Sequence, residues 1–320
     1  MLQVVMEEKI GYLSFVDTVC GKVKEILGEE YQVQICKVIK NNSLELDSLV
    51  VLKEGRNYAP NIYLLPYYES YLEGTPVQEV VKRLCVIYQN QEGPILSEDF
   101  TYSLEEMKQY IIYRLVSFER NQKLLSQIPH IKYLDLAITF HCLVREDEEG
   151  IGTIRITNEH MKQWKTTTEE LNTYAARNTS KRFPASIKNI GETILGLLHE
   201  ERNQKSEEAM AEEWMEQLIK SQQSAGNHSM YILTNQKGIN GASCILYSNI
   251  LFDFACQIKS DFYILPSSIH EVILVPSRKK IDKENLEQMV WEVNHTHVAP
   301  EEVLSDRVYY YSRENNAILL

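Results

Sequence analysis

The chain has 320 residues, of which 44% are hydrophobic and 24% are charged, and its formal net charge is −12. This size and composition are ordinary for a globular protein with a substantial core in one or two domains. The chain has no basic run that could neutralise nucleic-acid phosphates, and no apolar run approaches the roughly 20 residues that span a bilayer. We therefore expect neither nucleic acid nor a membrane as a partner.

The start of the chain and its cysteines indicate a cytoplasmic protein. Glu7 and Glu8 stand where a secretory signal would carry positive charge. The six cysteines form no CxxC pair, and most lie inside apolar segments, as reduced core cysteines do. They are Cys20, Cys36, Cys85, Cys142, Cys244 and Cys256.

The N-terminal third predicts a helix, a small antiparallel sheet and a second helix. Apolar residues recur at helical spacing over 13–27. Two strands follow, separated by Asn41 and Asn42, which tolerate the positive φ of a tight turn. The apolar alternation of the second strand slips phase at Asp47-Ser48, which predicts a β-bulge. A short strand at 61–65 and a helix at 75–89 complete this part.

The middle of the chain predicts a helix, a strand and a helix over 103–127, followed by a central strand at 131–146. Ser103 and Glu106 form a capping box, and IIYRLVS has strand character. The central strand is apolar on both faces and returns through TIRIT. A second capping box, Thr167 with Glu170, starts another helix. We expect an acidic helical insert at about 185–222, including a solvated helix at 199–218, and a linker at 221–229.

The last hundred residues predict the order β-α-β-β-α-β of ferredoxin-like folds. The segments are MYILT, ASCILYSNILFDFACQI, DFYILP, EVILVP, KENLEQMVWEV and RVYYYS. The whole chain therefore reads as an α+β protein with mixed or antiparallel sheets and flanking helices. We place an N-terminal module at 1–127 and a C-terminal module at 128–320.

Several segments together resemble a family of uncharacterised proteins that carry a domain of unknown function and occur in anaerobic Gram-positive bacteria. The resemblance runs from near residue 40 to near residue 312 and does not include His295 and His297. It implies one fold and a bacterial origin, and it carries no activity. The matching stretches are KNNSLELDSL, PNIYLLPYYESY, IPHIKYLDLAITFHCLV, MYILTN, GASCILY, LPSSIHEVILVP and VAPEEVLSDRVYYY.

The stretch LPSSIHEVILVP holds the weak catalytic candidates Ser268, His270 and Glu271. A serine–histidine pair needs a separation of about 2.6–3.2 Å between hydroxyl and imidazole. On an extended strand the Cα atoms of Ser268 and His270 lie roughly 6–7 Å apart, and Glu271 faces the other way. The strand–elbow–helix motif GxSxG of serine hydrolases is absent. We therefore expect a polar corner between two strands, with ligand binding or catalysis as alternatives.

The loop NQKGINGASC is a weak candidate for anion or nucleotide binding, through Asn235, Lys237, Gly238 and Gly241. It joins a strand to the start of a predicted helix, where backbone N–H groups attract anions. Its spacing matches neither GxGxxG nor a P-loop, and a compact connection explains its glycines equally well.

His295 and His297 are weak metal candidates, because an HxH pair supplies only two of the three or four ligands that zinc needs. Neither His-Glu pair in the chain continues into HExxH. We expect no metal and no cofactor. His141 and Cys142 should face opposite sides of the central strand, so they cannot form a dyad.

No complete catalytic constellation is present, and 19 tyrosines, concentrated in LLPYYESY and RVYYYS, suit either binding surfaces or sheet edges. We predict a non-catalytic binding or protein-interaction protein with an unknown protein or small-molecule partner. The alternative is an enzyme with its site near the Ser267–Glu271 corner and the 235–243 loop. Convergence of His270, Ser268, Asn235 and Lys237 in one cleft would favour the enzyme.

Overall fold

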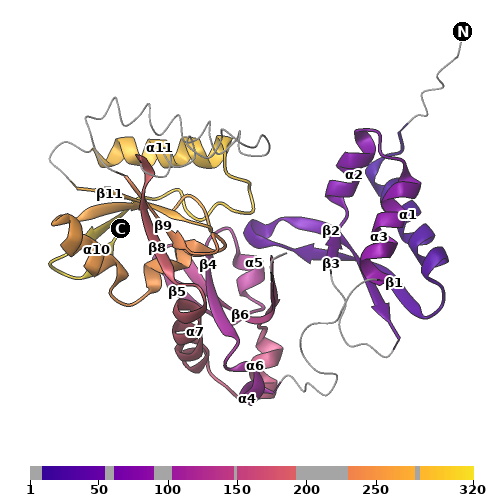
Figure 1. Ribbon diagram of the computed structural model, residues 1–320, viewed down its shortest axis with the longest axis horizontal. Helices are drawn as coiled ribbons and strands as arrows, with labels where there is room; N and C mark the ends of the chain where they lie inside the picture. Colours follow the sequence, from indigo (N-terminus) through magenta and orange to yellow (C-terminus); the bar gives the residue numbers. More distant parts are fainter. Residues whose placement is uncertain (1–8, 55–60, 90–102, 148–149, 192–229, 278–281) are drawn as a thin grey trace, which may run out of the picture. The chain divides into compact units, whose positions relative to one another are not determined.

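The computed structural model describes residues 9–54, 61–89, 103–147, 150–191, 230–277 and 282–320. The chain forms two compact units, one of residues 1–40 and 44–94 and the other of residues 41–43 and 95–320 (Figure 1). The boundary therefore lies near residue 94 rather than at the predicted residue 127. The predicted acidic helix at 199–218 and the linker at 221–229 lie outside the described residues.

The first unit is a three-stranded antiparallel sheet with three helices. In sheet order the strands are β1 (Tyr31–Ile39), β2 (Glu45–Lys53) and β3 (Asn61–Tyr63), and the helices are α1 (Tyr12–Leu27), α2 (Leu65–Leu72) and α3 (Val77–Gln89). Asn42 has a φ of 57° in the β1–β2 connection, as the sequence predicted.

The predicted β-bulge in β2 is wrong. The β1–β2 register runs without a shift, and it pairs Lys37 with Asp47 and Cys36 with Ser48. Asp47 shares a face with the buried Leu49 and lies beside the hydroxyl of Tyr12. A polar residue with a partner therefore fills the inward position, so the apolar pattern changes phase while the backbone continues regularly.

The tyrosines of α2 pack into the first unit instead of forming an exposed patch. The ring of Tyr68 lies 5.2 Å from that of Phe15, and the ring of Tyr71 lies 5.4 Å from it. Tyr67, Tyr68 and Tyr71 all pack against the buried cluster around Phe15. This segment therefore gives little support to a tyrosine-lined binding surface.

The second unit begins with a four-stranded sheet centred on β6 (Leu136–Asp147), which pairs with β4 (Ile111–Ser117), β5 (His130–Tyr133) and β7 (Gly150–Arg155). The short helices α4 (Leu104–Met107) and α5 (Gln122–Leu125) flank β4, which confirms the predicted helix, strand and helix. The predicted single strand at 131–146 is instead the hairpin β5–β6, because Leu134 adopts a φ of 57°.

A six-stranded sheet forms the other half of this unit. Its order is β13 (Ala317–Leu319), β12 (Tyr309–Ser312), β10 (Phe262–Leu265), β11 (Val272–Pro276), β9 (Tyr231–Asn235) and β8 (Ala185–Asn189). All strand pairings between the described strands are antiparallel, and with the flanking helices they give an α+β fold.

The strand order in space is not that of a ferredoxin-like fold, although the chain order β-α-β-β-α-β is present from β9 to β12. A ferredoxin-like sheet would place β12 beside β9. Here β12 pairs with β10, and β8 occupies the position beside β9. Residues 185–189, predicted as the start of a helical insert, form this additional strand.

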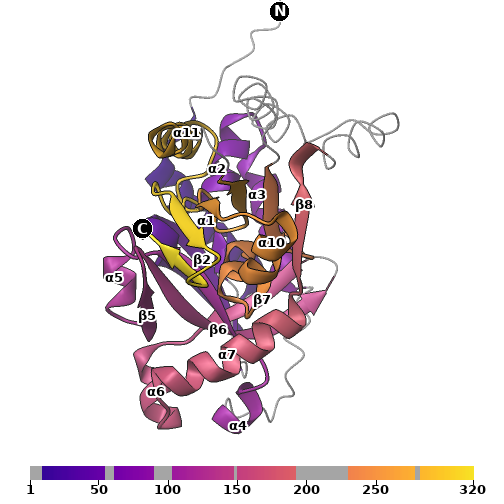
Figure 2. The same cartoon turned by 90° about the vertical axis from the view of Figure 1, so that its left-hand side faces the viewer.

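Two apolar layers cover the faces of the six-stranded sheet. One lies under α11 (Lys283–Thr296) and includes Leu286 and Val290. The other contains α10 (Ile250–Ile258), the 3-10 helix η2 (Gly241–Leu246) and α7 (Thr168–Arg182), and it continues to one face of the four-stranded sheet. Figures 1 and 2 show α10 and α11 on opposite sides of the sheet.

The helix boundaries follow local capping. Ser103 and Thr167 form the predicted capping boxes, and Thr157 with His160 forms a third at α6 (Asn158–Trp164). The predicted helix over 242–258 is divided into η2 and α10, because Asn249 has a φ of 65° between them. Among the described helices, none is long and apolar enough to cross a membrane.

Candidate functional site

The SSIHE segment is a tight corner between β10 and β11, as the sequence predicted. Ser267 and Ser268 are buried, and Ser268 forms an isolated antiparallel bridge with Val303. The Oγ of Ser268 accepts a hydrogen bond of 3.0 Å from the backbone N–H of His270. The Ser268 hydroxyl therefore stabilises the local turn.

The imidazole of His270 contacts two other segments of the second unit. Its Nδ1 accepts a hydrogen bond of 3.3 Å from the backbone N–H of Asn240, and its Nε2 lies 3.3 Å from Oε1 of Glu302. These contacts favour the tautomer with hydrogen on Nε2. The ring thus joins the corner to the 235–243 loop and to the segment that contains Glu302.

Glu271 does not orient the imidazole. Burial raises the pKa of this carboxyl, and the nearby Glu302 carboxylate adds to the rise, while His270 and a hydrogen bond from Ser268 oppose it. Glu302, which lies 31 positions further along the chain, occupies the place beside Nε2 instead.

The corner lacks the arrangement that nucleophilic catalysis needs. A serine nucleophile must donate its proton to a free imidazole nitrogen. Here Nδ1 already accepts from Asn240, Nε2 faces Glu302, and the Ser268 oxygen accepts from a backbone N–H. Ser268 and His270 instead stabilise the turn and its contacts with Asn240 and Glu302.

The 235–243 loop packs directly against this corner. Thr234 Oγ1 donates to the carbonyl of His270 at 2.8 Å, and the N–H of Ala242 donates to the carbonyl of Ile269 at 3.2 Å. A Cβ on Gly241 would lie 2.5 Å from the His270 carbonyl oxygen, so only glycine fits this approach. The loop and the corner therefore form one rigid structure.

The four ligand-binding candidates of the loop have local structural roles. Asn235 is buried, donates to the carbonyl of Ile239 and accepts from the N–H of Lys237. Lys237 Nζ lies 3.8 Å from a carboxylate oxygen of Glu146, and Gly238 has a φ of 67°. Around the start of η2, the N–H groups of Asn240, Ala242 and Ser243 already donate to acceptors within the protein.

The metal candidates His295 and His297 lie at the C-terminal end of α11. His295 is in the last turn of α11, and His297 is the residue after the helix. The Nδ1 of His295 contacts the Trp291 carbonyl, and that of His297 contacts the Thr296 hydroxyl. Among the described residues, no three His, Cys, Asp or Glu side chains are grouped to hold a metal ion.

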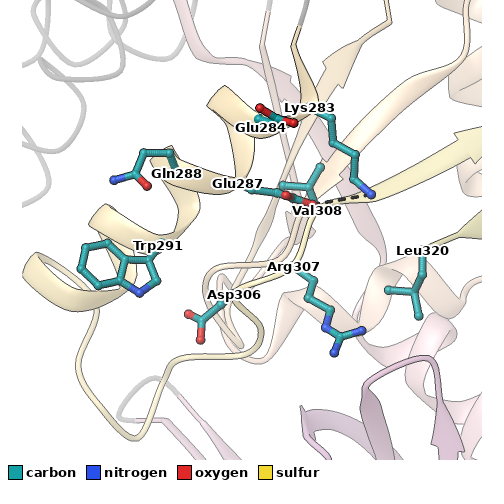
Figure 3. Close-up of a pocket in the computed structure, with 9 residues that line it drawn as sticks. All are labelled: Lys283, Glu284, Glu287, Gln288, Trp291, Asp306, Arg307, Val308 and Leu320. Carbon is teal, nitrogen blue, oxygen red and sulfur yellow. Dashed lines mark ion pairs between the residues drawn. The ribbon is translucent and has the colours of Figure 1, made fainter.

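A groove of about 540 Å³ lies beside α11 in the second unit (Figure 3). Trp291 is 49% exposed on its wall, and its ring stacks on His295 with 4.3 Å between ring centroids. The groove is open to solvent along the helix, and its lining combines charged, polar and apolar residues. They are Lys283, Glu284, Glu287, Gln288, Trp291, Asp306, Arg307, Val308 and Leu320.

The charges of the groove are only partly paired. Lys283 Nζ lies 3.5 Å from Glu287 Oε1, and Asp306 is bound by Arg120 and Asn294 at 2.7 Å each. The exposed guanidinium of Arg307 forms no ion pair with the described residues. Arg307 is therefore available to an anionic group that enters the groove.

The tyrosines of RVYYYS are mostly buried. Tyr309 and Tyr311 belong to the core, and Tyr310 donates a hydrogen bond of 2.8 Å to Asp261. They stabilise the six-stranded sheet and do not line the groove.

His141 and Cys142 face opposite sides of β6, as predicted. Cys142 belongs to the main core, whereas Nε2 of His141 lies 3.1 Å from the Thr139 hydroxyl. Burial, assisted by the positive charges of Arg114 and Arg155, holds the pKa of His141 well below its usual 6.5. His141 is therefore neutral in the folded protein at neutral pH.

We expect His141 to weaken the fold in mild acid. Because its folded pKa lies below its unfolded value, the unfolded chain binds more protons as pH falls through 6.5. Each further pH unit then costs about 1.4 kcal/mol until the folded pKa is reached. Urea unfolding of wild type and His141→Gln at pH 7.5 and 5.5 measures this. Equal pH dependence in both proteins would contradict it.

Comparison with known proteins places most of the chain in one family. The model of a family of unknown function, DUF5688, matches residues 12–313. The chain belongs to this family. No curated protein and no solved structure matches the chain. For this DUF5688 member, the site must therefore be inferred from its own geometry.

Sequence reasoning missed Asn240 and Glu302 at the corner and Trp291 and Arg307 at the groove. A signal for Trp291 was present, because it lies outside the apolar stripe of α11 that Leu286 and Val290 define. No sequence signal connects Glu302 with His270, since their contact depends on how the segment after α11 returns to the corner.

Proposed function

We propose that the protein is a non-catalytic binding protein and that the groove beside α11 binds a segment of a partner protein. The observation that carries this proposal is the half-exposed Trp291 in the same groove as Arg307, which forms no ion pair with any residue that the structure describes. Tryptophan and arginine are the residues most often found at the energetic centres of protein interfaces.

The shape of the groove favours an extended segment over a small molecule. Small-molecule sites usually enclose most of the ligand surface. This groove is open and follows α11 from Lys283 to Trp291, a rise of roughly 12 Å at 1.5 Å per residue. A length of roughly four extended residues fits beside it.

The lining defines the chemistry of the segment. The Arg307 guanidinium suits a carboxylate, which it can bind with two parallel hydrogen bonds. Trp291 and the exposed Leu320 suit an aliphatic or aromatic side chain. We therefore infer a partner segment with an acidic residue a few positions from a large apolar one.

The geometry of the corner supports a binding role over the alternative of an enzyme near Ser267–Glu271. Both ring nitrogens of His270 are engaged, and the candidate nucleophile Ser268 is buried. Asn235 and Lys237 do lie in the loop that packs on the corner, but Asn235 is turned to its own backbone.

Selection of peptides from a random displayed library tests this proposal. We expect wild-type protein to enrich peptides that combine an acidic and a large apolar residue. Arg307→Gln and Trp291→Ala should each weaken their binding at least about 10-fold, the usual loss when an interface anchor is removed. Arg177→Gln is the matched control, because it removes an exposed arginine on α7. Equal binding of the peptides to all four proteins would show that the groove is not the binding site.

A further inference from the structure

The second face of the four-stranded sheet carries a band of basic side chains, Arg114, His141 and Arg155, between two apolar clusters. At one end lie Val116 and Ala137 with α5, and at the other lie Ile112 and Leu143 with Phe183. Between them the register places Arg114 opposite Thr139, and His141 opposite Arg155. This band is separate from the groove beside α11.

The guanidinium of Arg114 has no ion-pair partner among the residues that the structure describes. Its Nε is buried without a hydrogen bond to these residues. Burial and the charge of Arg155 lower the pKa of Arg114 to about 10, so it stays charged at neutral pH. A buried charge without a partner destabilises the folded state, and a bound counter-ion would offset this.

Among the described strand positions on this face, the ionisable side chains are Arg114, His130, Lys132, His141, Glu146 and Arg155. The one carboxylate in this set, Glu146, lies 3.8 Å from Arg182 and from Lys237 and forms no ion pair with Arg114. Thr139 adds a hydroxyl within hydrogen-bond reach of His141. Arginine, imidazole and hydroxyl groups together form the donor set that proteins use for oxyanions.

The edge of β4 has room for one oxygen atom. A cavity of about 10 Å³ is lined by Arg114 together with Asn235, Asn240 and Ser243 of the neighbouring loop. This is about the space that one water oxygen needs. An oxyanion with one oxygen here would lie beside the guanidinium of Arg114.

We propose that Arg114 and its neighbours on this face bind a small oxyanion, a carboxylate or phosphate group. The site is independent of the proposed partner groove. If Arg114 binds an anion, its removal should not destabilise the anion-free protein. If Arg114 has a purely structural role, its removal should lower the stability of the protein. Arg114→Gln is therefore expected to melt no lower than wild type in chloride buffer.

Thermal unfolding in potassium phosphate and in potassium chloride of equal ionic strength tests the site. At a phosphate concentration ten times its Kd for the wild-type protein, phosphate should raise the Tm of wild type and of the matched control Arg177→Gln by about 3 °C. Arg114→Gln should show no rise. Sulfate and acetate, tested alongside, distinguish a phosphate from a carboxylate preference.

The proposal fails if no anion raises the Tm of the wild type more than chloride does. It also fails if the anion raises the Tm of Arg114→Gln as much as it raises that of the wild type. Phosphorus NMR provides a readout that does not depend on the variant folding. Wild-type protein should broaden the inorganic phosphate resonance, and excess sulfate or acetate should reverse this. An unchanged line width with folded wild type would also overturn the site.

Discussion

Replacing Gly241 with alanine lowers the free energy of unfolding of the second unit by about 3 kcal/mol or more, the upper range for overpacking. The added Cβ would lie 2.1 Å from the Thr234 Oγ1, 2.5 Å from the His270 oxygen and 2.7 Å from the Asn235 nitrogen. Two of these atoms belong to backbone that is held in the sheet and the corner. The loop would have to separate from the corner, which would also break the contact between Asn240 and His270.

Gly238→Ala is the matched control within the same loop. Gly238 has a φ of 67° and open space around it, so alanine there costs only about 1 kcal/mol of backbone strain. All three tryptophans, Trp164, Trp214 and Trp291, lie in the second unit. Urea unfolding followed by tryptophan fluorescence therefore reports on this unit alone. Similar losses in the two variants would show that the loop does not pack tightly on the corner.

Replacing Asp135 with alanine lowers the free energy of unfolding by about 3 kcal/mol, because two hydroxyl groups lose a charged acceptor. Tyr309 donates to one carboxylate oxygen at 2.5 Å, and Ser305 donates to the other at 2.6 Å. Tyr309 is fully buried, and its pKa is raised by burial and by Asp135. These bonds connect the β5–β6 hairpin with the six-stranded sheet.

A double-mutant cycle with Tyr309→Phe isolates this contact. Tyr309→Phe alone should cost less, about 1.5 kcal/mol, because the ring still fills its site and Asp135 keeps Ser305. The coupling energy between the two substitutions should then exceed about 1 kcal/mol. Additive effects, measured by the same fluorescence, would show that the two side chains do not interact.

Regular periodicity and capping made much of the fold predictable. The helices α1, α3 and α11, the strands β9 to β12 and the capping boxes follow from local pattern. The errors occur where one residue interrupts a pattern. Leu134, which has a positive φ, turns a predicted strand into a hairpin. Asn249, which also has a positive φ, divides a predicted helix into η2 and α10. The position of β8 beside β9 is a long-range pairing, which local pattern does not encode.

The candidate site shows the same limit. Strand alternation correctly separated Glu271 from His270, yet it could not identify Glu302 as the carboxylate beside the ring. The tyrosine-rich segments suited either binding surfaces or sheet edges, and in β12 burial and hydrogen bonds to aspartates hold these side chains in the sheet. Arg114 was visible as the one charged residue in IIYRLVS, although its lack of an ion-pair partner among the described residues could be seen only in the fold.

Quantitative affinity capture from a native lysate tests most directly whether function lies in the groove or at the corner. The bait proteins are wild type, Trp291→Ala, Arg307→Gln, His270→Ala and the control Arg177→Gln, each checked as folded by fluorescence. A binding role for the groove predicts a protein captured by wild type, His270→Ala and Arg177→Gln and reduced at least about 10-fold with Trp291→Ala and Arg307→Gln. Full capture by both groove variants, or its loss with folded His270→Ala, would contradict this role.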